Sequence, residues 1–231
     1  MFRVLKVMPS HSSMSGHIKL FSLLNMFQDT AELAVEHIEG NIDELYAKGF
    51  AWIVTKYEIS ILGELPKISD TFALETFHDP FHSYNTLRMF RLILDGNEVL
   101  TAKTSWILID TNSGKPVKPI AHIPCITKSL SCKEIHDTFT EIPDVIHPET
   151  SQTLQVSYHD IDYNQHVNHA VYFKWVYDIF NRSGKYPTHL CASFRSGAKL
   201  GENITIQCEN GAFSVLREGS QRPCAKFFLE D

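Results

Sequence analysis

The chain has 231 residues, of which 43% are hydrophobic and 21% charged, and its formal net charge at pH 7 is −6. This length allows one large domain or two small ones with a real hydrophobic core. The negative charge argues against broad nucleic-acid binding, which requires a basic face. No apolar run is long enough to span a bilayer, and the start, MFRVLKVMPS, turns polar too early for a secretory signal. We therefore expect a cytoplasmic protein with no nucleic-acid or membrane partner.

The cysteines predict reduced thiols rather than crosslinks. None of them belongs to a CxxC pair, and they are spread along the chain as Cys125, Cys132, Cys191, Cys208 and Cys224. Closely spaced cysteines are the usual mark of a structural zinc site or a disulfide framework. We expect these thiols to be small buried apolar groups in a cytoplasmic protein.

The first half of the chain predicts one long helix followed by an antiparallel meander. Residues 17–38 carry apolar side chains at helical spacing, and Gly40 follows as a stop signal. The sequence then changes to alternating, β-branched segments, which predict strands beginning at Trp52, Thr71, Thr86 and Glu98. Asp95-Gly96-Asn97 lies between the last two strands and is a favourable hairpin turn.

The second half repeats this order after a connector. Residues 111–150 are rich in proline and lack periodicity. A strand is predicted from Thr153, and a helix of about four turns is predicted from Val167 to a stop at Gly184. Short strands are then predicted from Thr188, Glu202, Ala212 and Cys224. The fold class is therefore α+β, with one long helix and an antiparallel sheet occurring twice.

The repeated order indicates an internal duplication. A gapless overlay of the two halves places His17 over His166 and Asp29 over Asp178. We expect an N-terminal unit at 1–125, a connector at 126–150 and a C-terminal unit at 151–231.

The stretch DIDYNQHVNHAVYF, which begins at Asp160, places acids, amides and histidines directly before an apolar helix. Asp162, Asn164 and His166 alternate, so in an extended segment their side chains would share one face. The backbone N–H groups at the start of the helix, near Val167 and Asn168, are donors that suit a polarised carbonyl oxygen. The stretch therefore predicts a site that acts on a carbonyl group.

The same stretch resembles the signature of the acyl-acyl carrier protein thioesterases, which runs roughly D-x-D-x-N-Q-H-V-N-N before an aromatic helix. AWIVTKYEI, from Ala51, and TSWILIDTNSGKPVKPI, from Thr104, resemble further segments of these enzymes. The resemblance extends from about residue 15 to about residue 210. It implies a double hotdog: two tandem units, each with a long central helix wrapped by an antiparallel β-sheet.

The resemblance also implies a function. Water would hydrolyse a fatty acyl-acyl carrier protein thioester without a covalent intermediate, a cofactor or a metal. Asp162 would hold or activate the water, Asn164 would orient the carbonyl or the water, and His166 would donate a hydrogen bond or shuttle a proton. The first unit would mainly supply the acyl pocket. The expected substrate-binding residues are Leu23, Met26, Phe27, Trp52, Val167 and Asn168.

Two positions depart from the family pattern. The family usually has a Glu followed by a Cys or a small residue on the strand after the helix, and the alignment places Gly197 and Ala198 there. Ala198 rules out a cysteine nucleophile at this site. Glu202 is the nearest acid, but on a regular strand it would face the opposite side. Either Asp162 alone serves as the base, or the protein is slow, altered or no longer an enzyme.

Several of these residues also have a structural interpretation. Asp160 and Asp162 could cap a turn or the entry to a helix. Asn168 is expected to be an N-cap rather than a catalytic group. His159 and His169 are expected to be peripheral.

A metal site is not expected. The His166/His169 pair lacks the Glu of a zinc-protease helix. Pro80 argues against a helix that would align His78 and His82.

The partner follows from charge. Acyl carrier protein is acidic, so a net-acidic enzyme must concentrate basic groups on one docking surface. Four basic residues that cluster in sequence near the motif could form it: Arg182, Lys185, Arg195 and Lys199. Two alternatives remain: a thioesterase acting chiefly on acyl-CoA, and a non-catalytic acyl-thioester binding protein. A duplicated hotdog could be a monomer or a homodimer.

Overall fold

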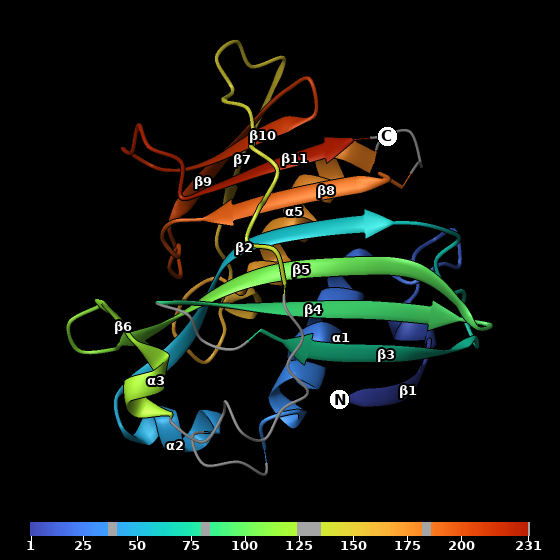
Figure 1. Cartoon of the computed structure of the whole chain (residues 1–231). Helices are drawn as coiled ribbons and strands as arrows, with labels where there is room; N and C mark the ends of the chain where they lie inside the picture. Colours follow the sequence, from blue (N-terminus) through green and yellow to red (C-terminus); the bar gives the residue numbers. More distant parts are fainter. Residues whose placement is uncertain (37–40, 80–83, 124–134, 182–185, 231) are drawn as a thin grey trace. The chain divides into compact units, whose positions relative to one another are not determined.

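The protein is described here from a computed structural model, which covers residues 1–36, 41–79, 84–123, 135–181 and 186–230. Contacts divide the chain into two compact units. Unit 1 comprises Met1–Thr55 and Ile59–Thr138, and unit 2 comprises Lys56–Glu58 and Phe139–Asp231. Each unit contains one antiparallel sheet with one longer helix on one of its faces (Figure 1). No helix in the described part of the chain is long and apolar enough to cross a membrane.

The sheet of unit 1 has the strand order β1-β3-β4-β5-β2, with β6 paired to β5. Its strands are β1 (Phe2–Lys6), β2 (Phe50–Ile61), β3 (Thr71–His78), β4 (Asn85–Leu94), β5 (Asn97–Asp110) and β6 (Pro116–Val117). Its helices are the short 3₁₀ turn η1 (Pro9–His11), α1 (Leu20–Leu33), α2 (Ile42–Ala47) and α3 (Pro119–His122). The four predicted strands are present, but only β3, β4 and β5 form a meander, because β2 lies next to β5 and not next to β3. Strand β1 was not predicted.

The core of unit 1 lies between α1 and the sheet. Burial alternates along β3, as expected for a strand with one face on the core. Phe27 of α1 stacks on Phe90 of β4, with ring centroids 4.6 Å apart and an interplanar angle of 7°. Both rings are fully buried. The apolar face of α1 therefore packs on the sheet and forms one side of this core.

Helix α1 is shorter than predicted. The prediction began at His17, but Ser12 and Ile18 form a bridge that takes the intervening residues into a turn, and α1 begins at Leu20. The predicted stop at Gly40 lies outside the described residues. The predicted hairpin is confirmed, because Asp95 and Gly96 have φ of 50° and 81°, the positive values that a type I′ turn requires.

Unit 2 repeats the architecture with shorter strands. Residues 56–58 of β2 lie beside β8, and the order continues as β11-β10-β9-β7. The elements are β7 (Thr150–Gln155), the 3₁₀ turn η2 (Tyr158–Asp160), α5 (His169–Phe180), β8 (His189–Phe194), β9 (Asn203–Glu209), β10 (Ala212–Arg217) and β11 (Ala225–Glu230). Aromatic rings of α5 and the sheet meet in the core, where Phe173 lies edge-on to Phe227 with centroids 5.0 Å apart. Helix α5 has 12 residues, about one turn fewer than predicted.

The two units share a turn before the helix. A bridge between Ser12 and Ile18 precedes α1, and a bridge between Ile161 and Val167 precedes α5. The numbering offset is 149 for both bridge partners (161 − 12 and 167 − 18). It equals the offset that places His17 over His166 in the sequence, which supports the duplication.

Hydrogen bonds inside the two turns follow the same offset. The N–H of Ser13 donates to the carbonyl of His17 at 2.8 Å, and the N–H of Asp162 donates to the carbonyl of His166 at 2.8 Å. The left-handed position is a glycine in unit 1 and Gln165 in unit 2, with φ of 83° and 62°. Unit 1 thus has serine at 13 and 15 where unit 2 has Asp162 and Asn164.

The burial predicted for the cysteines holds for two of the three that the structure describes, because Cys208 is only half-buried. Cys191, Cys208 and Cys224 are free thiols, and Cys191 and Cys224 are buried. Cys125 and Cys132 lie outside the described residues.

Candidate active site

The residues before α5 form a tight turn in unit 2. Besides the bond from Asp162 to His166, the N–H of Gln165 donates to the carbonyl of Asp162 at 3.0 Å. The segment is therefore not extended, so the condition under which the alternating side chains of Asp162, Asn164 and His166 would share one face is not met. The chain reverses because the Asp162 carboxylate accepts the N–H of Asn164 at 2.8 Å, which forms an Asx turn, and Gln165 is left-handed. The structure nevertheless brings all three predicted catalytic residues into this one turn.

Asp162 is a half-buried carboxyl group. Burial raises its pKa, although the N–H groups of Asn164 and His166 and the nearby imidazole of His166 oppose that shift. The side chain of Asp162 thus accepts a hydrogen bond within the turn and, when ionised, places a negative charge beside His166. The cap interpretation and the catalytic interpretation of Asp162 are compatible.

His166 has a defined tautomer. Its Nδ1 lies 2.8 Å from the carbonyl oxygen of Asn164. A carbonyl oxygen can only accept, so Nδ1 carries the proton and donates. In the neutral ring Nε2 then has a lone pair, which can accept a proton. This geometry suits a proton acceptor more directly than the hydrogen-bond donor that the sequence suggested as one option.

Asn164 is half-buried. Its backbone donates to Asp162 and accepts from His166. Its side-chain amide has no recorded partner among the described residues, so it can bind a carbonyl oxygen or a water.

The start of α5 differs from the expectation. Asn168 is the N-cap, as predicted, and its Oδ1 accepts the N–H of Ala170 at 2.8 Å. The N–H of Val167 donates to the carbonyl of Ala198 at 2.9 Å, and that of Asn168 donates to the carbonyl of Asp160 at 2.9 Å. The backbone N–H groups of these two predicted substrate-binding residues are therefore already used. Among the described residues, the first helical N–H without a recorded acceptor is that of His169.

Gly197 lies against the ring of His166. A Cβ at position 197 would be 2.6 Å from Cδ2 and 2.8 Å from Cγ of His166, which is too close for any real contact. The slot in which the family pattern places an acid is thus bordered by the imidazole itself. Ala198 is fully buried, and its N–H donates to the hydroxyl of Tyr172 at 2.8 Å.

Glu202 has a structural role in the loop before β9. Its carboxylate accepts the N–H of Lys199 at 3.1 Å and the guanidinium of Arg217 at 2.6 Å. Burial raises the pKa of Glu202, but these hydrogen bonds outweigh it and leave the pKa below its usual value. Both carboxylate oxygens are occupied, so Glu202 does not replace the missing acid.

The neighbouring acid and histidines have separate roles. Asp160 caps η2 by accepting both the N–H and the hydroxyl of Ser157, at 2.8 and 2.7 Å. His159 is exposed, as the prediction of a peripheral residue requires. His169 is not peripheral, because its Nε2 lies 3.1 Å from the hydroxyl of Tyr57 and burial lowers its pKa to about 4.

A hollow lies in unit 1, at the C-terminal half of α1. Its walls are formed by Gln28, Ala31, Glu32, Val35, Ile42, Trp52, His78, Thr86, Arg88 and Trp106. Trp52 is the only one of the four predicted unit-1 pocket residues among them. Leu23 and Phe27 are fully buried core residues, and Met26 is half-buried and is not among the residues that line the hollow. Sequence periodicity could not separate wall from core, because both are apolar residues on the same helix face.

Two family descriptions match this chain. Residues 3–123 match the acyl-ACP thioesterase N-terminal domain, and residues 145–224 match the acyl-ACP thioesterase C-terminal domain. The chain belongs to the acyl-ACP thioesterase family. In this acyl-ACP thioesterase family member, each of the two matched domains corresponds to one half of the predicted duplication.

Curated relatives are distant. The acyl-acyl carrier protein hydrolase of Cuphea viscosissima is 25% identical over 181 residues, which are 67% of this chain and 41% of that protein. The palmitoyl-acyl carrier protein thioesterase of Cuphea hookeriana is 24% identical and is matched over 40% of its length. This acyl-ACP thioesterase family member therefore spans about two fifths of the length of these relatives.

Solved structures share the fold of this acyl-ACP thioesterase family member. An acyl-ACP thioesterase from Bacteroides thetaiotaomicron is 21% identical with a TM-score of 0.83, covering 100% of this chain and 96% of that one. The 12:0-ACP thioesterase from Umbellularia californica is 15% identical with the same TM-score of 0.83 and the same coverage. A probable thioesterase from Escherichia coli, 15% identical with a TM-score of 0.51, matches 57% of this chain with 99% of its own. The predicted double hotdog is thus confirmed.

Proposed function

We propose that the protein hydrolyses fatty acyl-acyl carrier protein thioesters to a free fatty acid and the carrier thiol. The observation that carries this proposal is the state of His166: Nδ1 donates to the carbonyl of Asn164, which leaves Nε2 as a proton acceptor beside the carboxylate of Asp162. A general base of this kind contributes about 10²- to 10⁴-fold to a rate.

Water is the nucleophile in the proposed reaction. Nε2 of His166 takes a proton from water as the oxygen attacks the thioester carbonyl. Asp162 stabilises the imidazolium that forms, as a carboxylate next to a protonated histidine does. The tetrahedral intermediate then collapses, the carbon–sulfur bond breaks, and the imidazolium returns its proton to the departing thiolate. The products are a fatty acid and a thiol, with no acyl-enzyme, since Ala198 stands where a cysteine would be needed.

Two groups are proposed to hold the carbonyl oxygen. The side-chain amide of Asn164 is one, because it has no recorded partner among the described residues. The N–H of His169 is the other, because it is the first donor of α5 without a recorded acceptor in that part of the chain and lies at the positive end of the helix dipole. The acyl chain is proposed to bind in the hollow of unit 1 that contains Trp52.

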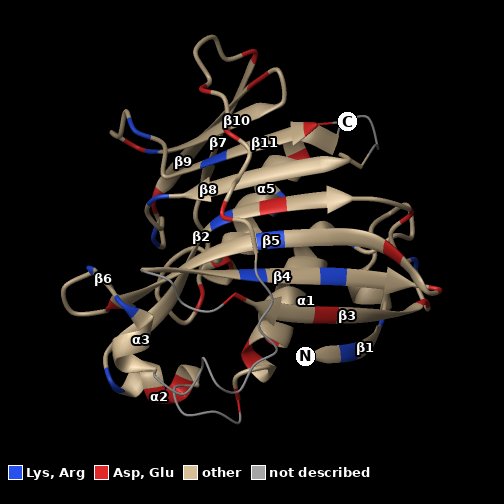
Figure 2. Cartoon of the chain, viewed as in Figure 1, with Lys and Arg blue, Asp and Glu red and all other residues tan. Residues whose placement is uncertain are grey.

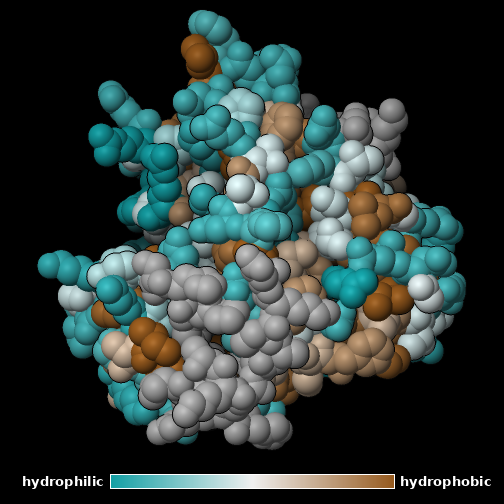
Figure 3. Space-filling model, viewed as in Figure 1, coloured by the Kyte–Doolittle hydropathy of each residue, from teal (hydrophilic) through white to brown (hydrophobic). Residues whose placement is uncertain are grey.

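The carrier is proposed to dock on the loop that follows β8. Arg195 and Lys199 are exposed there, and Figure 2 shows Lys and Arg where the chain leaves β8 and continues to β9. Figure 3 shows strongly hydrophilic atoms over the same loops. An acidic carrier is attracted to such a surface over a Debye length of about 8–10 Å. Arg182 and Lys185, the other two predicted basic residues, lie outside the described residues.

The test measures thiol release from acyl carrier protein thioesters and acyl-CoA over a range of chain lengths. The variants are Asp162→Asn and, as a matched control, Asp160→Asn, because both acids accept backbone N–H groups but only Asp162 lies beside His166. We expect release by the wild type, a loss of about 100-fold or more in Asp162→Asn, and near-normal release in Asp160→Asn.

The same experiment separates the alternatives. Higher kcat/KM with CoA than with the carrier would make the protein an acyl-CoA thioesterase. Tight binding of the acyl carrier without thiol release, in a folded wild type, would favour the non-catalytic binding protein and would contradict the proposal.

A further inference from the structure

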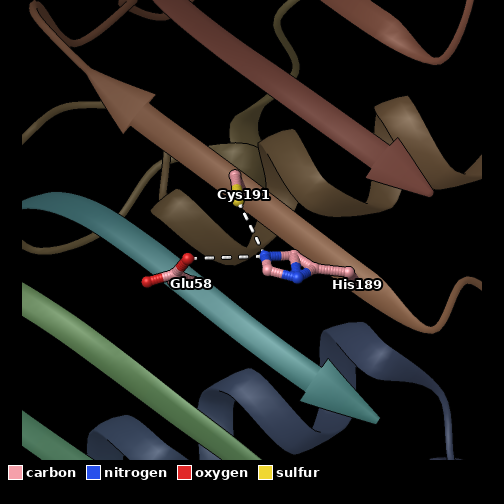
Figure 4. Close-up of side chains that lie close together, drawn as sticks. All are labelled: Glu58, His189 and Cys191. Atoms are coloured by element: carbon pink, nitrogen blue, oxygen red, sulfur yellow. Dashed lines mark hydrogen bonds and ion pairs between the residues drawn. The ribbon is translucent and has the colours of Figure 1, made fainter. Parts of the chain in front are cut away.

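A second cluster of reactive side chains lies in unit 2, away from the turn at 162–166 in sequence. Glu58 of β2 and His189 and Cys191 of β8 direct their side chains to a common point (Figure 4). Nε2 of His189 lies 3.1 Å from Sγ of Cys191 and 3.5 Å from Oε1 of Glu58. The three donor atoms all lie within 4.8 Å of one another.

The strand geometry explains the convergence. His189 and Cys191 are two residues apart on β8, so their side chains stand on the same face of the sheet. Glu58 stands on the adjacent segment of β2. Its neighbour Tyr57 points to the opposite face, where its hydroxyl meets His169. The three donors therefore share the face of the sheet that does not carry α5.

The arrangement is poorly explained by hydrogen bonds alone. Nε2 of an imidazole has either one N–H bond or one lone pair in the ring plane. It cannot point in line at both the sulfur of Cys191 and the oxygen of Glu58. A cation placed between the three atoms would accept a lone pair from each of them.

We propose that Glu58, His189 and Cys191 form a binding site for Zn²⁺ or a divalent ion of similar softness. Zinc binds sulfur at about 2.3 Å and nitrogen or carboxylate oxygen at about 2.0–2.2 Å, which in a tetrahedron separates sulfur from nitrogen by about 3.6 Å and nitrogen from oxygen by about 3.4 Å. The observed separations of 3.1 and 3.5 Å are within about 0.5 Å of these values. A thiolate with an imidazole selects against Mg²⁺ and Ca²⁺, which prefer oxygen.

The charge of the three ligands and the hydrogen bonds to Glu58 are both consistent with a bound metal ion. One carboxylate and one thiolate neutralise a divalent ion, which lowers the cost of partial burial. The hydroxyl of Thr140 donates to Oε1 of Glu58 at 2.5 Å and its N–H donates to the same oxygen at 3.3 Å, and hydrogen bonds of this kind orient a carboxylate that binds a metal.

The site is also reachable. The side chains of His189 and Glu58 are 27% and 16% exposed, whereas Cys191 is buried. Three protein ligands with an exposed side leave the fourth tetrahedral position to a water. The ion would crosslink residues 56–58 to β8 and so stabilise the hydrogen bond between Tyr57 and His169. This proposal does not depend on the thioesterase activity.

Cobalt provides a direct test, because a thiolate bound to Co²⁺ gives a sulfur-to-metal charge-transfer band that oxygen and nitrogen ligands do not give. The 231-residue chain is treated with a chelator to remove bound metal and is then titrated with Co²⁺ and afterwards with Zn²⁺. We expect one equivalent to bind with the thiolate band present, and Zn²⁺ to displace it and raise the Tm. Cys191→Ser should lose the band, while Cys208→Ser, a half-buried thiol on β9, should keep it.

Two further variants protect the test from a folding artefact. Glu58→Gln and His189→Gln keep a polar side chain at each position. Each variant should lower the affinity for Zn²⁺ by more than about 100-fold, since even the loss of a residue that only hydrogen-bonds to a ligand lowers metal affinity 10- to 100-fold. The absence of stoichiometric binding by the folded wild type would overturn the proposal. So would a thiolate band that survives in Cys191→Ser, or unchanged Zn²⁺ affinity in folded Glu58→Gln and His189→Gln.

Discussion

The ring of His166 occupies the space that a side chain at Gly197 would need. A Cβ at position 197 would lie 2.6 Å from Cδ2 of His166, while Nδ1 of the same ring donates to the carbonyl of Asn164 at 2.8 Å. The glycine and the ring position therefore depend on each other. The sequence pattern suggested that an acid is missing at 197, whereas the structure shows that this backbone has no room for one.

We predict that Gly197→Ala lowers kcat by about 10- to 100-fold, because the methyl group pushes the imidazole away from its hydrogen bond. Overpacking of this kind costs about 1–3 kcal/mol of stability. The measurement is thiol release together with the pH titration of His166 by NMR. Gly63→Ala is the matched control, since its Cβ would meet Val99 at 3.3 Å in unit 1 and should leave kcat unchanged. A Gly197→Glu variant that is faster than the wild type would contradict this account.

Asp162 should make the fold less stable in its ionised form. Burial raises the pKa of Asp162 above its ordinary value. Since the folded-state pKa lies above the unfolded-state pKa, the folded protein binds this proton more tightly, and stability rises as the pH falls through that folded pKa. Asp162→Asn keeps an acceptor for the N–H of Asn164 without the charge. We therefore expect a higher Tm than the wild type at pH 7, with the difference shrinking toward pH 4. Equal Tm values at pH 7 would argue against this account.

His169 should make unit 2 sensitive to acid. Burial lowers its pKa from 6.5 to about 4. A histidine with a depressed pKa contributes stability above its unfolded-state pKa and loses it as the pH falls from about 6.5 to about 4, by up to about 3 kcal/mol. Denaturant unfolding at pH 7 and pH 4.5 should show a smaller loss for His169→Gln than for the wild type. His159→Gln, at an exposed position, should behave as the wild type does.

A larger side chain in the hollow of unit 1 should shorten the preferred acyl chain. Ala31 of α1 lines this hollow, so Ala31→Phe would fill it. We expect kcat/KM for long acyl chains to fall by about 10-fold or more relative to short ones, since each excluded methylene is worth about 0.8 kcal/mol. Ala47→Phe makes the same change at an exposed position of α2 and should leave the profile unaltered. A uniform loss over all chain lengths would locate the acyl site elsewhere.

Charge reversal on the loop after β8 should weaken binding of the acyl carrier protein without changing the rate of hydrolysis. Arg195→Glu with Lys199→Glu should raise KM for acyl carrier protein thioesters by about 10-fold at low salt, with little effect on a neutral acyl-pantetheine. Lys6→Glu, an exposed lysine of β1, is the control for net charge. An equal rise in KM for the acyl-pantetheine would mean that these residues act on the site itself.

Local features of the sequence determined much of the outcome. The alternation of β3, the positive-φ turn at Asp95 and Gly96, and the N-cap at Asn168 all depend on a few adjacent residues, so periodicity and side-chain type were sufficient to predict them. The offset between His17 and His166 was visible without structure for the same reason, since a duplication is preserved in residue order.

Other features depended on contacts between distant residues, and only the tertiary structure decided them. The turn at 162–166 is stabilised partly by the bond from Val167 to the carbonyl of Ala198, and this long-range partner removes the donor that sequence reasoning assigned to substrate. Leu23 and Trp52 are both apolar, yet one is core and the other lines the hollow. Glu58 meets His189 and Cys191 only because β2 and β8 are neighbours in the sheet. Sequence spacing determines which residues can share a face, but strand pairing and close packing determine which side chains meet across it.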